Sequence, residues 1–206
     1  ALRLFGWLDQ YQLPLHIPCI ACDLAKARRR PHRGKTRRAE YAGQIWHADL
    51  MSSGDVIGMD GSKYAAFFTD DASGKILTFP LLKKSQFAEV MRQFLARLRT
   101  LPETMVLDSG GENISKQFLE TCYSYCIHPV YSTKEMHTEN LAERAIQTLR
   151  DTSMTMLASA AMNPCFWPWA IQYAAYIYDF LPRADGKPPY LHWHDKLPSN
   201  LSLPVF

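Results

Sequence analysis

The sequence lacks any long hydrophobic run, because no stretch approaches the roughly 18–20 consecutive apolar residues of a membrane-spanning helix. No signal peptide opens the chain, and its five cysteines are an odd number that fits no secreted disulfide framework. We therefore expect no membrane partner and a reducing compartment. What is present is 47% hydrophobic and 21% charged residues among 206, the composition of a globular protein with a core.

Positive charge is concentrated in one segment, although the net charge of the chain is only +3. Eight basic residues and no acidic one lie between Lys26 and Arg38, so the rest of the chain carries a net charge of −5. Such a run favours contact with a polyanion such as nucleic acid, while a nuclear-import signal or a solubilising linker has the same composition. The candidate nucleic-acid contacts in this run are Arg28, Arg29, Arg30, Arg33, Lys35, Arg37 and Arg38.

The chain divides into three parts by composition. Residues 1–25 are apolar-rich and end in the pair Cys19-x-x-Cys22. Residues 26–43 read as a basic linker, since they contain proline and glycine and show no apolar periodicity. We expect the compact domain to occupy residues 44–206, where segments of strand and helix character follow one another.

Residue periodicity predicts an α/β domain, a mixed sheet flanked by helices. Turn residues between the second and third strands predict a hairpin, and the last helix is apolar nearly all round, which favours burial. The predicted strands cover residues 45–51, 64–69, 75–81, 104–107 and 129–131. The predicted helices cover residues 85–98, 115–126, 139–161 and 166–181.

Three carboxylates fall where such a fold exposes reactive groups. Asp49 ends the first predicted strand, Asp108 ends the fourth, and Glu143 lies in the first turns of the long helix. Each alone is an ordinary surface acid, but three carboxylates that converge require a cation between them, and Mg²⁺ or Mn²⁺ suits oxygen ligands. Two such ions are suited to phosphoryl transfer.

The motifs around these acids resemble those of one family. They are Trp46-His47-Ala48-Asp49-Leu50, Thr69-Asp70-Asp71-Ala72-Ser73, Leu107-Asp108-Ser109-Gly110-Gly111 and Asn140-Leu141-Ala142-Glu143-Arg144. In order and spacing the series resembles the integrase of copia-type LTR retrotransposons over nearly all of residues 19–206. The resemblance implies an RNase H-like, retroviral-integrase-like catalytic core whose Asp, Asp, Glu metal triad is Asp49, Asp108 and Glu143.

Other acids compete for the catalytic role. Asp70 and Asp71 fit the turn of the hairpin, and Glu139 fits an acid placed at a helix start, so the motif match favours Glu143. The interval from Asp108 to Glu143 is one residue shorter than is usual in the family, whose Asn-Gly-x-Ala-Glu-Arg motif lacks its glycine here.

Two further sets of residues are candidates for binding. Glu143, Gln147 and Arg150 share one face of the long helix, so Gln147, Arg150 and the adjacent Arg144 are candidate DNA contacts. Cys19 and Cys22 resemble the second half of the zinc module that precedes these integrase cores. A structural Zn²⁺ needs four ligands, and the two family histidines have no match upstream, so the partial zinc module is either incomplete in this chain or lost.

The resemblance implies a DNA integrase that joins the 3′ ends of element DNA to target DNA. Its partners would be both DNAs and further copies of the chain, and it would act in the nucleus, or in a cytoplasmic virus-like particle before import. The family continues past Phe206 into a longer polyprotein, so the chain reads as a slice of one or as a domesticated remnant. The alternatives are a catalytically inactive DNA- or protein-binding module and a stand-alone nuclease of the same fold.

Overall fold

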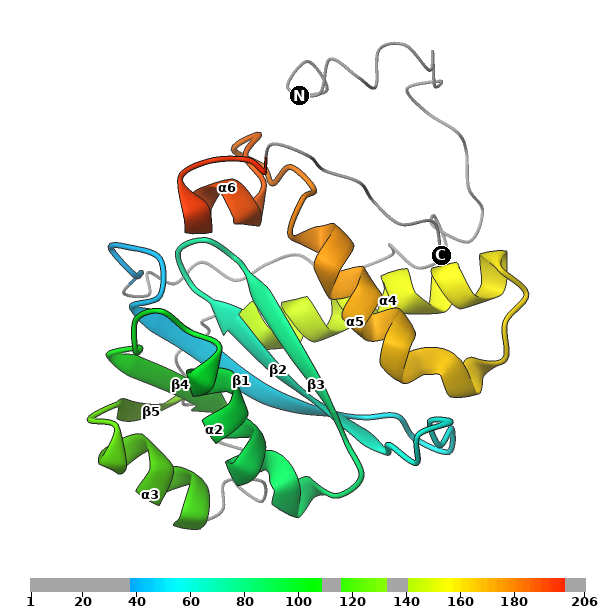
Figure 1. Cartoon of the computed structure of the whole chain (residues 1–206), viewed down its shortest axis with the longest axis horizontal. Coiled ribbons are helices and arrows are strands. Elements are labelled where there is room, and N and C mark those ends of the chain that lie inside the picture. The colour runs from blue at the N-terminus through cyan, green and yellow to red at the C-terminus, as the bar shows by residue number, and fades with distance from the viewer. Residues whose placement is uncertain (1–37, 109–115, 133–140, 199–206) are drawn as a thin grey trace.

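A five-stranded mixed sheet forms the centre of the molecule (Figure 1). The computed structural model describes residues 38–108, 116–132 and 141–198, and the order of strands across the sheet is β3-β2-β1-β4-β5. The strands are β1 (Ile45–Ser52), β2 (Tyr64–Asp70), β3 (Ile76–Leu81), β4 (Thr104–Asp108) and β5 (His128–Ser132). All five strands predicted from the sequence are confirmed, each within one or two residues of its expected limits.

The connections explain why the sheet is mixed. Strands β1, β2 and β3 follow one another without an intervening helix and pair antiparallel, and β2 and β3 form the predicted hairpin. Strands β4 and β5 each return after a longer connection and pair parallel, β4 with β1 and β5 with β4. The sheet therefore places β1 at its centre, with an antiparallel neighbour on one side and a parallel neighbour on the other.

Helices cover both faces of this sheet. The four helices predicted from the sequence are confirmed, while a short fifth α-helix near the end of the described chain was not predicted. The helices are η3 (Lys84–Gln86), α2 (Phe87–Ala96), α3 (Lys116–Ser124), α4 (Leu141–Ser159), η4 (Pro164–Phe166), α5 (Trp167–Tyr178) and α6 (Pro189–His194).

Alternation along the strands divides the core into two layers. On one face, Trp46, Ala48 and Phe68 join the buried side chains of α2 and α3. On the other face, Ala65 and Phe67 join the buried side chains of α4 and α5. Because successive strand residues point to opposite faces, the sequence position of a β1 residue decides which pair of helices it meets.

Stacked aromatic rings fill the layer under α2. Phe94 of α2 stacks on Phe68 with ring centroids 4.0 Å apart, and its edge meets Trp46 at 4.9 Å. Trp193 of α6 meets the other side of Trp46 at 5.4 Å, so the short last helix packs on the same cluster. Trp46, Phe68 and Phe94 are fully buried, so this cluster anchors β1, β2 and α2 to one another.

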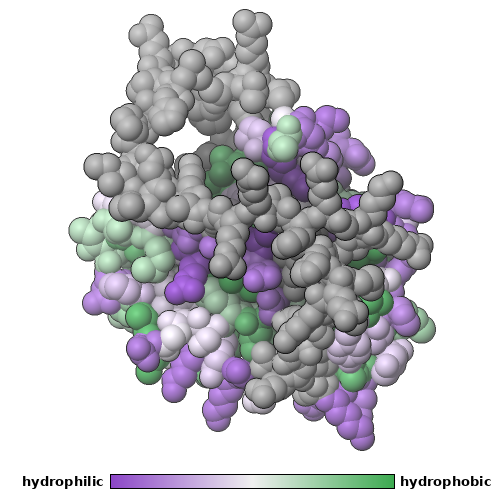
Figure 2. Space-filling view, turned by 180° about the vertical axis from the view of Figure 1, so that it is seen from behind, coloured by the Kyte–Doolittle hydropathy of each residue, from purple (hydrophilic) through white to green (hydrophobic). Residues whose placement is uncertain are grey.

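Helix α5 is less buried than its composition predicts. It packs on α4 and on the edge strand β3, and its opposite side faces solvent with Trp169 44% and Tyr176 40% exposed. The expectation of burial all round is wrong for that side, because nothing in the described chain covers α5 from outside. Seen from behind, the described surface mixes hydrophilic and hydrophobic residues (Figure 2). In the part of the chain that the structure describes, no helix has the length and hydropathy to cross a membrane.

Replacement of Phe94 by alanine is expected to lower the free energy of unfolding by about 3–5 kcal/mol, since it removes a ring that is fully buried between Trp46 and Phe68. Chemical denaturation followed by tryptophan fluorescence measures the change. The control is Gln93→Ala, one residue earlier on the exposed side of α2, which should change stability by less than about 0.5 kcal/mol. Equal losses for the two variants would contradict this account of the core.

Candidate functional site

Parallel pairing of β1 with β4 brings the first two predicted catalytic positions onto neighbouring strands. The paired residues run from Ile45 opposite Thr104 to Ala48 opposite Leu107, and the next residues along the two strands are Asp49 and Asp108. The backbone of Asp108 is in turn in register with Ser132 of β5. Two positions 59 residues apart in sequence therefore lie side by side at the carboxyl end of the β1–β4 ladder.

Asp49 lies on the face of the sheet that α4 covers. Its antiparallel partner is Phe67, which belongs to the core layer under α4 and α5, whereas Ala48 belongs to the layer under α2 and α3. Residues directly opposite one another in a ladder share a face, so the half-buried Asp49 side chain points to the α4 side. Its Oδ1 accepts a hydrogen bond from the backbone N–H of Leu50 at 2.7 Å.

Glu143 reaches this region from α4. It lies in the first turn of the helix, as the sequence predicts, and its side chain is exposed. Helix α4 packs against both β1 and β2, with Ala145 and Leu149 buried underneath. The strand bearing Asp49 and the helix bearing Glu143 are thus in direct contact.

Some of the predicted site residues lie outside the described residues, and so does the side chain of Asp108. Among the side chains that the structure describes, no three His, Cys, Asp or Glu residues gather into a metal-binding group. Gln147, Arg144 and Arg150 are exposed on α4 near Glu143, as a nucleic-acid contact requires. The residues Arg28, Arg29, Arg30, Arg33, Lys35, Arg37, Cys19, Cys22 and Glu139 all lie outside the described residues, so their roles stay predictions.

Arg38, the last residue of the basic run, contacts a carboxylate of the core. Its Nη1 lies 3.0 Å from Oδ1 of Asp71, and the next residue, Ala39, donates its backbone N–H to Oδ2 of the same carboxylate at 2.7 Å. The Arg38 side chain nevertheless stays 64% exposed. Asp71 therefore fixes the position at which the basic run meets the core.

The same carboxylate reaches into the sheet. His47 Nε2 lies 3.3 Å from Asp71 Oδ1, and the histidine is two residues before Asp49 on the same face of β1. Burial acts to raise the pKa of Asp71, but hydrogen bonds from His47, Ala39 and Arg38 outweigh it and lower the pKa to about 2. Asp71 is thus a charged, nearly buried link between the basic run and the strand that carries Asp49.

Asp70 has a structural role in the turn, as the sequence indicates. Its carboxylate accepts hydrogen bonds from the N–H and the hydroxyl of Ser73 and from the N–H of Gly43. The residue is fully buried, and that burial raises its pKa. Asp70 and Asp71 together hold residues 38–43 against the core, a contact that turn chemistry alone did not predict.

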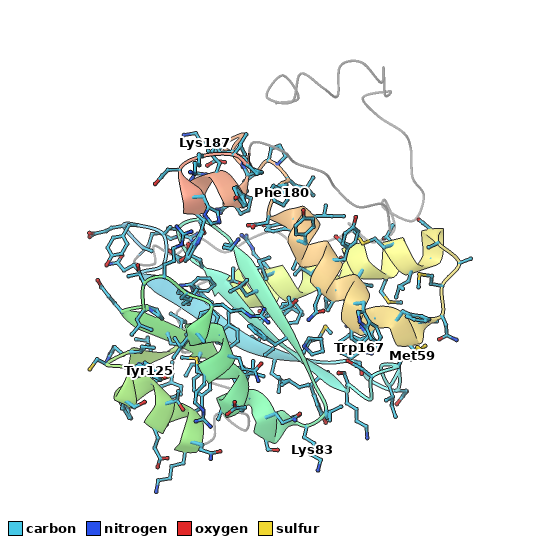
Figure 3. All side chains as sticks on the ribbon, in the orientation of Figure 1. Met59, Lys83, Tyr125, Trp167, Phe180 and Lys187 are labelled. Carbon is cyan, nitrogen blue, oxygen red and sulfur yellow. The ribbon has the colours of Figure 1, made fainter. Side chains whose placement is uncertain are left out.

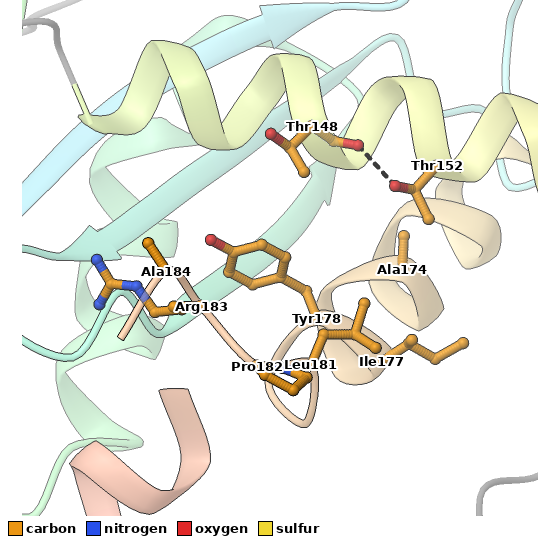
Figure 4. A pocket seen from close by; sticks show the side chains of 9 residues that line it. All are labelled: Thr148, Thr152, Ala174, Ile177, Tyr178, Leu181, Pro182, Arg183 and Ala184. Carbon is orange, nitrogen blue, oxygen red and sulfur yellow. Dashed lines mark hydrogen bonds between the residues drawn. The ribbon is translucent and has the colours of Figure 1, made fainter. Parts of the chain in front are cut away.

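One described hollow beside α4 does not include the proposed catalytic carboxylates. A cavity of about 370 Å³ lies between α4 and the end of α5, where Thr148 and Thr152 face Tyr178 and the chain around Arg183 (Figure 4). None of its lining residues is a predicted catalytic residue. Thr148, which the helical pattern places toward the core, is instead exposed and lines this hollow.

Replacement of Asp71 by asparagine is expected to lower the free energy of unfolding at neutral pH by about 1–3 kcal/mol, because charge-assisted hydrogen bonds to Arg38, His47 and Ala39 weaken together. Thermal or chemical denaturation measures the loss. The control is Asp185→Asn, which removes an equal charge from an exposed pair with His192 and should change stability little. Amide exchange should quicken at Ala39 in the Asp71 variant only.

The native chain and the Asp71→Asn variant also test how the stability contributed by Asp71 depends on pH. The pKa of Asp71 is about 2 in the folded chain against an ordinary value of 3.8, so its contribution to stability is complete above 3.8 and is lost as the pH falls toward 2. The difference in unfolding free energy between the native chain and Asp71→Asn should therefore shrink between about pH 5 and pH 2. A difference that stays constant over that range would contradict the assigned link.

Comparison with known proteins agrees with this geometry. Residues 39–136 match the family model for the integrase core domain. The chain is 29% identical over 203 residues to the Retrovirus-related Pol polyprotein from transposon TNT 1-94 of Nicotiana tabacum, which covers 92% of this chain and 15% of that polyprotein. It is 25% identical over 172 residues to the Retrovirus-related Pol polyprotein from transposon RE1 of Arabidopsis thaliana, which covers 81% of this chain and 12% of that one. The chain thus spans only a small part of the length of these relatives.

Solved structures share the fold. A chain of the simian T-cell lymphotropic virus intasome, determined in complex with PP2A regulatory subunit B56 gamma, superposes with a TM-score of 0.67 at 19% identity, over 91% of this chain and 66% of that chain. The HTLV-2 integrase catalytic core domain in complex with magnesium, in its trimeric form, gives a TM-score of 0.59 at 22% identity, over 76% of this chain and all of that chain. The resemblance to the integrases of LTR retrotransposons is therefore confirmed, and residues 39–136 are the part that matches the integrase core domain.

Proposed function

We propose that the chain is the catalytic core of a copia-type retrotransposon integrase, which joins 3′ ends of element DNA to target DNA. The observation that carries the proposal is the parallel register of β1 with β4, which ends at Ala48 opposite Leu107, so that Asp49 and Asp108 are the next residues on the two strands. The contact of α4 with β1 supports Glu143 as the third member of the set. Each residue comes from a different element of the fold, as a site built by tertiary structure requires.

The donor set fits a hard divalent cation. Asp49 and Glu143 both offer carboxylate oxygens, Asp49 from a half-buried position and Glu143 from an exposed one, and no sulfur or nitrogen ligand is among the proposed three. Asp49, Asp108 and Glu143 would hold Mg²⁺ or Mn²⁺. When bound, the ions would stabilise charge on the phosphate and on the attacking and leaving oxygens.

The polar face of α4 would position the DNA backbone. Gln147 and Arg150 follow Glu143 at i+4 and i+7, so all three lie on one exposed side of the helix. A guanidinium there can hold a phosphate beside the carboxylates without reading the base sequence. The basic run that ends at Arg38 would add further backbone contacts, anchored to the core through Asp71.

Assembly and location follow from the same proposal. Joining two DNA ends at one target needs more than one active site, and a structure similar in fold to this chain was determined in dimeric form. We therefore include a homo-oligomer in the proposal, together with action in the nucleus, where the target DNA lies. A Zn²⁺ site at Cys19 and Cys22 stays a prediction of the sequence alone.

Asp49→Asn and Asp108→Asn should each abolish Mg²⁺-dependent joining of a pre-cut DNA end to a plasmid, with a loss of at least about 10³-fold, because an amide cannot replace an anionic metal ligand. Binding of the same DNA, measured by fluorescence anisotropy, should change less than about threefold. The control is Asp195→Asn, an exposed site with φ of 57° that asparagine tolerates. Joining retained by either metal-site variant would exclude this site. If the native chain bound DNA with no joining at all, the inactive binding module would replace the proposal.

Glu143→Gln and Glu139→Gln separate the two candidates for the third ligand. Because Glu143 lies in the first turn of α4, a helix that contacts β1, its variant should lose joining, whereas the Glu139 variant should keep activity within about threefold. Single-turnover joining at saturating Mg²⁺ measures both. The opposite result would transfer the role to Glu139.

A further inference from the structure

Helix α2 and the short segments at its two ends carry a second concentration of positive charge, on the face of the sheet opposite to Asp49. Between residues 82 and 99 the sequence has five basic residues and one acidic residue, a net charge of +4 in a chain whose total is +3. The basic residues are Lys83, Lys84, Arg92, Arg97 and Arg99, and every one of them is exposed. Lys83 lies at the lower end of α2 in Figure 3.

The neighbouring charges do not neutralise this surface, which we call the α2 basic face (Lys83, Lys84, Arg92, Arg97 and Arg99). Glu89 forms an ion pair with Arg92 at 2.8 Å and offsets one charge. On the adjacent α3, Lys116 lies 3.8 Å from Glu120, so that pair adds no net charge. Near Arg99, the pKa of His194 is lowered, first by burial and then by surrounding cations that include Lys75 and Arg99.

The chemistry of the surface suits a phosphate backbone better than a protein partner. Protein interfaces are anchored by large apolar or aromatic side chains. The segment from Lys83 to Arg99 exposes no such side chain; Leu82 and Leu101 flank it in the sequence, and Tyr123 is exposed on the adjacent α3. Two of the cations lie over aromatic rings, Lys84 Nζ 5.7 Å from the Tyr64 centroid and Arg97 Cζ 4.5 Å from the Phe79 centroid, and both residues are exposed.

The length of the α2 basic face is enough for several phosphates of a DNA duplex. At a rise of 1.5 Å per residue, Lys84 and Arg97 lie about 20 Å apart along the helix direction. A DNA duplex of that length presents on the order of ten phosphates, several of them toward one side. The α2 basic face is thus long enough to contact more than one phosphate at once.

We propose that the α2 basic face binds the backbone of a DNA duplex, at a site separate from the proposed catalytic carboxylates. This inference rests on the proposed function in taking DNA as the polyanion. Because the sheet lies between α2 and Asp49, the duplex on α2 is a different stretch of backbone from the one at Asp49. Contacts of this kind add affinity and orientation but read no base sequence.

The test compares two double variants of the full chain that lose equal charge. Lys83→Gln with Arg99→Gln changes the α2 basic face at both ends, while Lys116→Gln with Lys187→Gln changes exposed lysines elsewhere. The affinity for a random 20-base-pair duplex is measured by anisotropy at several salt concentrations. The α2 double should lower the slope of log affinity against log salt by about 2 and weaken binding about tenfold near 0.1 M salt, and the control double should change the slope by less than about 0.5.

A second experiment looks for tighter DNA binding, a result that misfolding of a variant cannot produce. Glu89→Gln removes the one acid of the α2 basic face and releases Arg92, so it should tighten binding and steepen the salt slope by about 1. Its control is Glu120→Gln on α3, which should leave the slope within about 0.5. Equal effects of test and control variants in both experiments would overturn the inference.

The joining assay separates this inference from the proposed function. A native chain that joins DNA while the α2 and control variants bind alike would refute the α2 basic face and leave the catalytic proposal intact. A native chain that joins no DNA, but whose α2 double alone loses salt-dependent binding, would support the α2 basic face and refute the catalytic proposal.

Discussion

The register of β1 is the constraint on which the rest of the structure depends. Trp46 and Ala48 face the aromatic layer under α2, and this choice forces His47 and Asp49 to the opposite face, toward α4. A slip of one residue would exchange the two sets, which would place the Asp49 carboxylate in the aromatic layer under α2 and move the Trp46 indole out of that layer to the α4 side. The packing of one tryptophan with Phe68 and Phe94 therefore determines where the proposed catalytic aspartate points.

Most of the fold could be predicted because its signals are local. Short apolar and aromatic runs mark β1 to β3, and the 3.6-residue period marks α2, so each element is encoded within its own residues. Helix α6 has only six residues, and its position depends on Trp193 packing on Trp46 and on the Tyr190 N–H bound to the Asp179 carbonyl. Contacts of this kind join residues far apart in sequence, so no local pattern predicts them.

In the candidate site, too, the sequence predicts the residues but not the tertiary contacts that bring them together. Strand ends and motif order identify Asp49, Asp108 and Glu143, but their approach depends on parallel pairing and helix packing, which residue patterns do not specify. The role of Asp71 is a clearer case, since its partners Arg38 and His47 lie 33 and 24 residues away. The α2 basic face could not be predicted from the sequence for a related reason. Its charges are interleaved with buried residues at helical spacing, whereas the run before Arg38 is nearly continuous in sequence.

The positive charge of the molecule is concentrated in two regions, which the small net charge conceals. With the basic run and the α2 basic face set aside, the rest of the chain is strongly acidic, so binding of a polyanion must be confined to those two regions and to individual cations such as Arg150. Arg38 is the last residue of the basic run, and it differs from a free cation because it already has a carboxylate partner in Asp71. Exchanging that carboxylate for a phosphate replaces one anionic oxygen by another and gains little free energy. Arg38 is therefore suited to fix the geometry of the basic run against β1, and the affinity for DNA must come mainly from cations that give up no such partner.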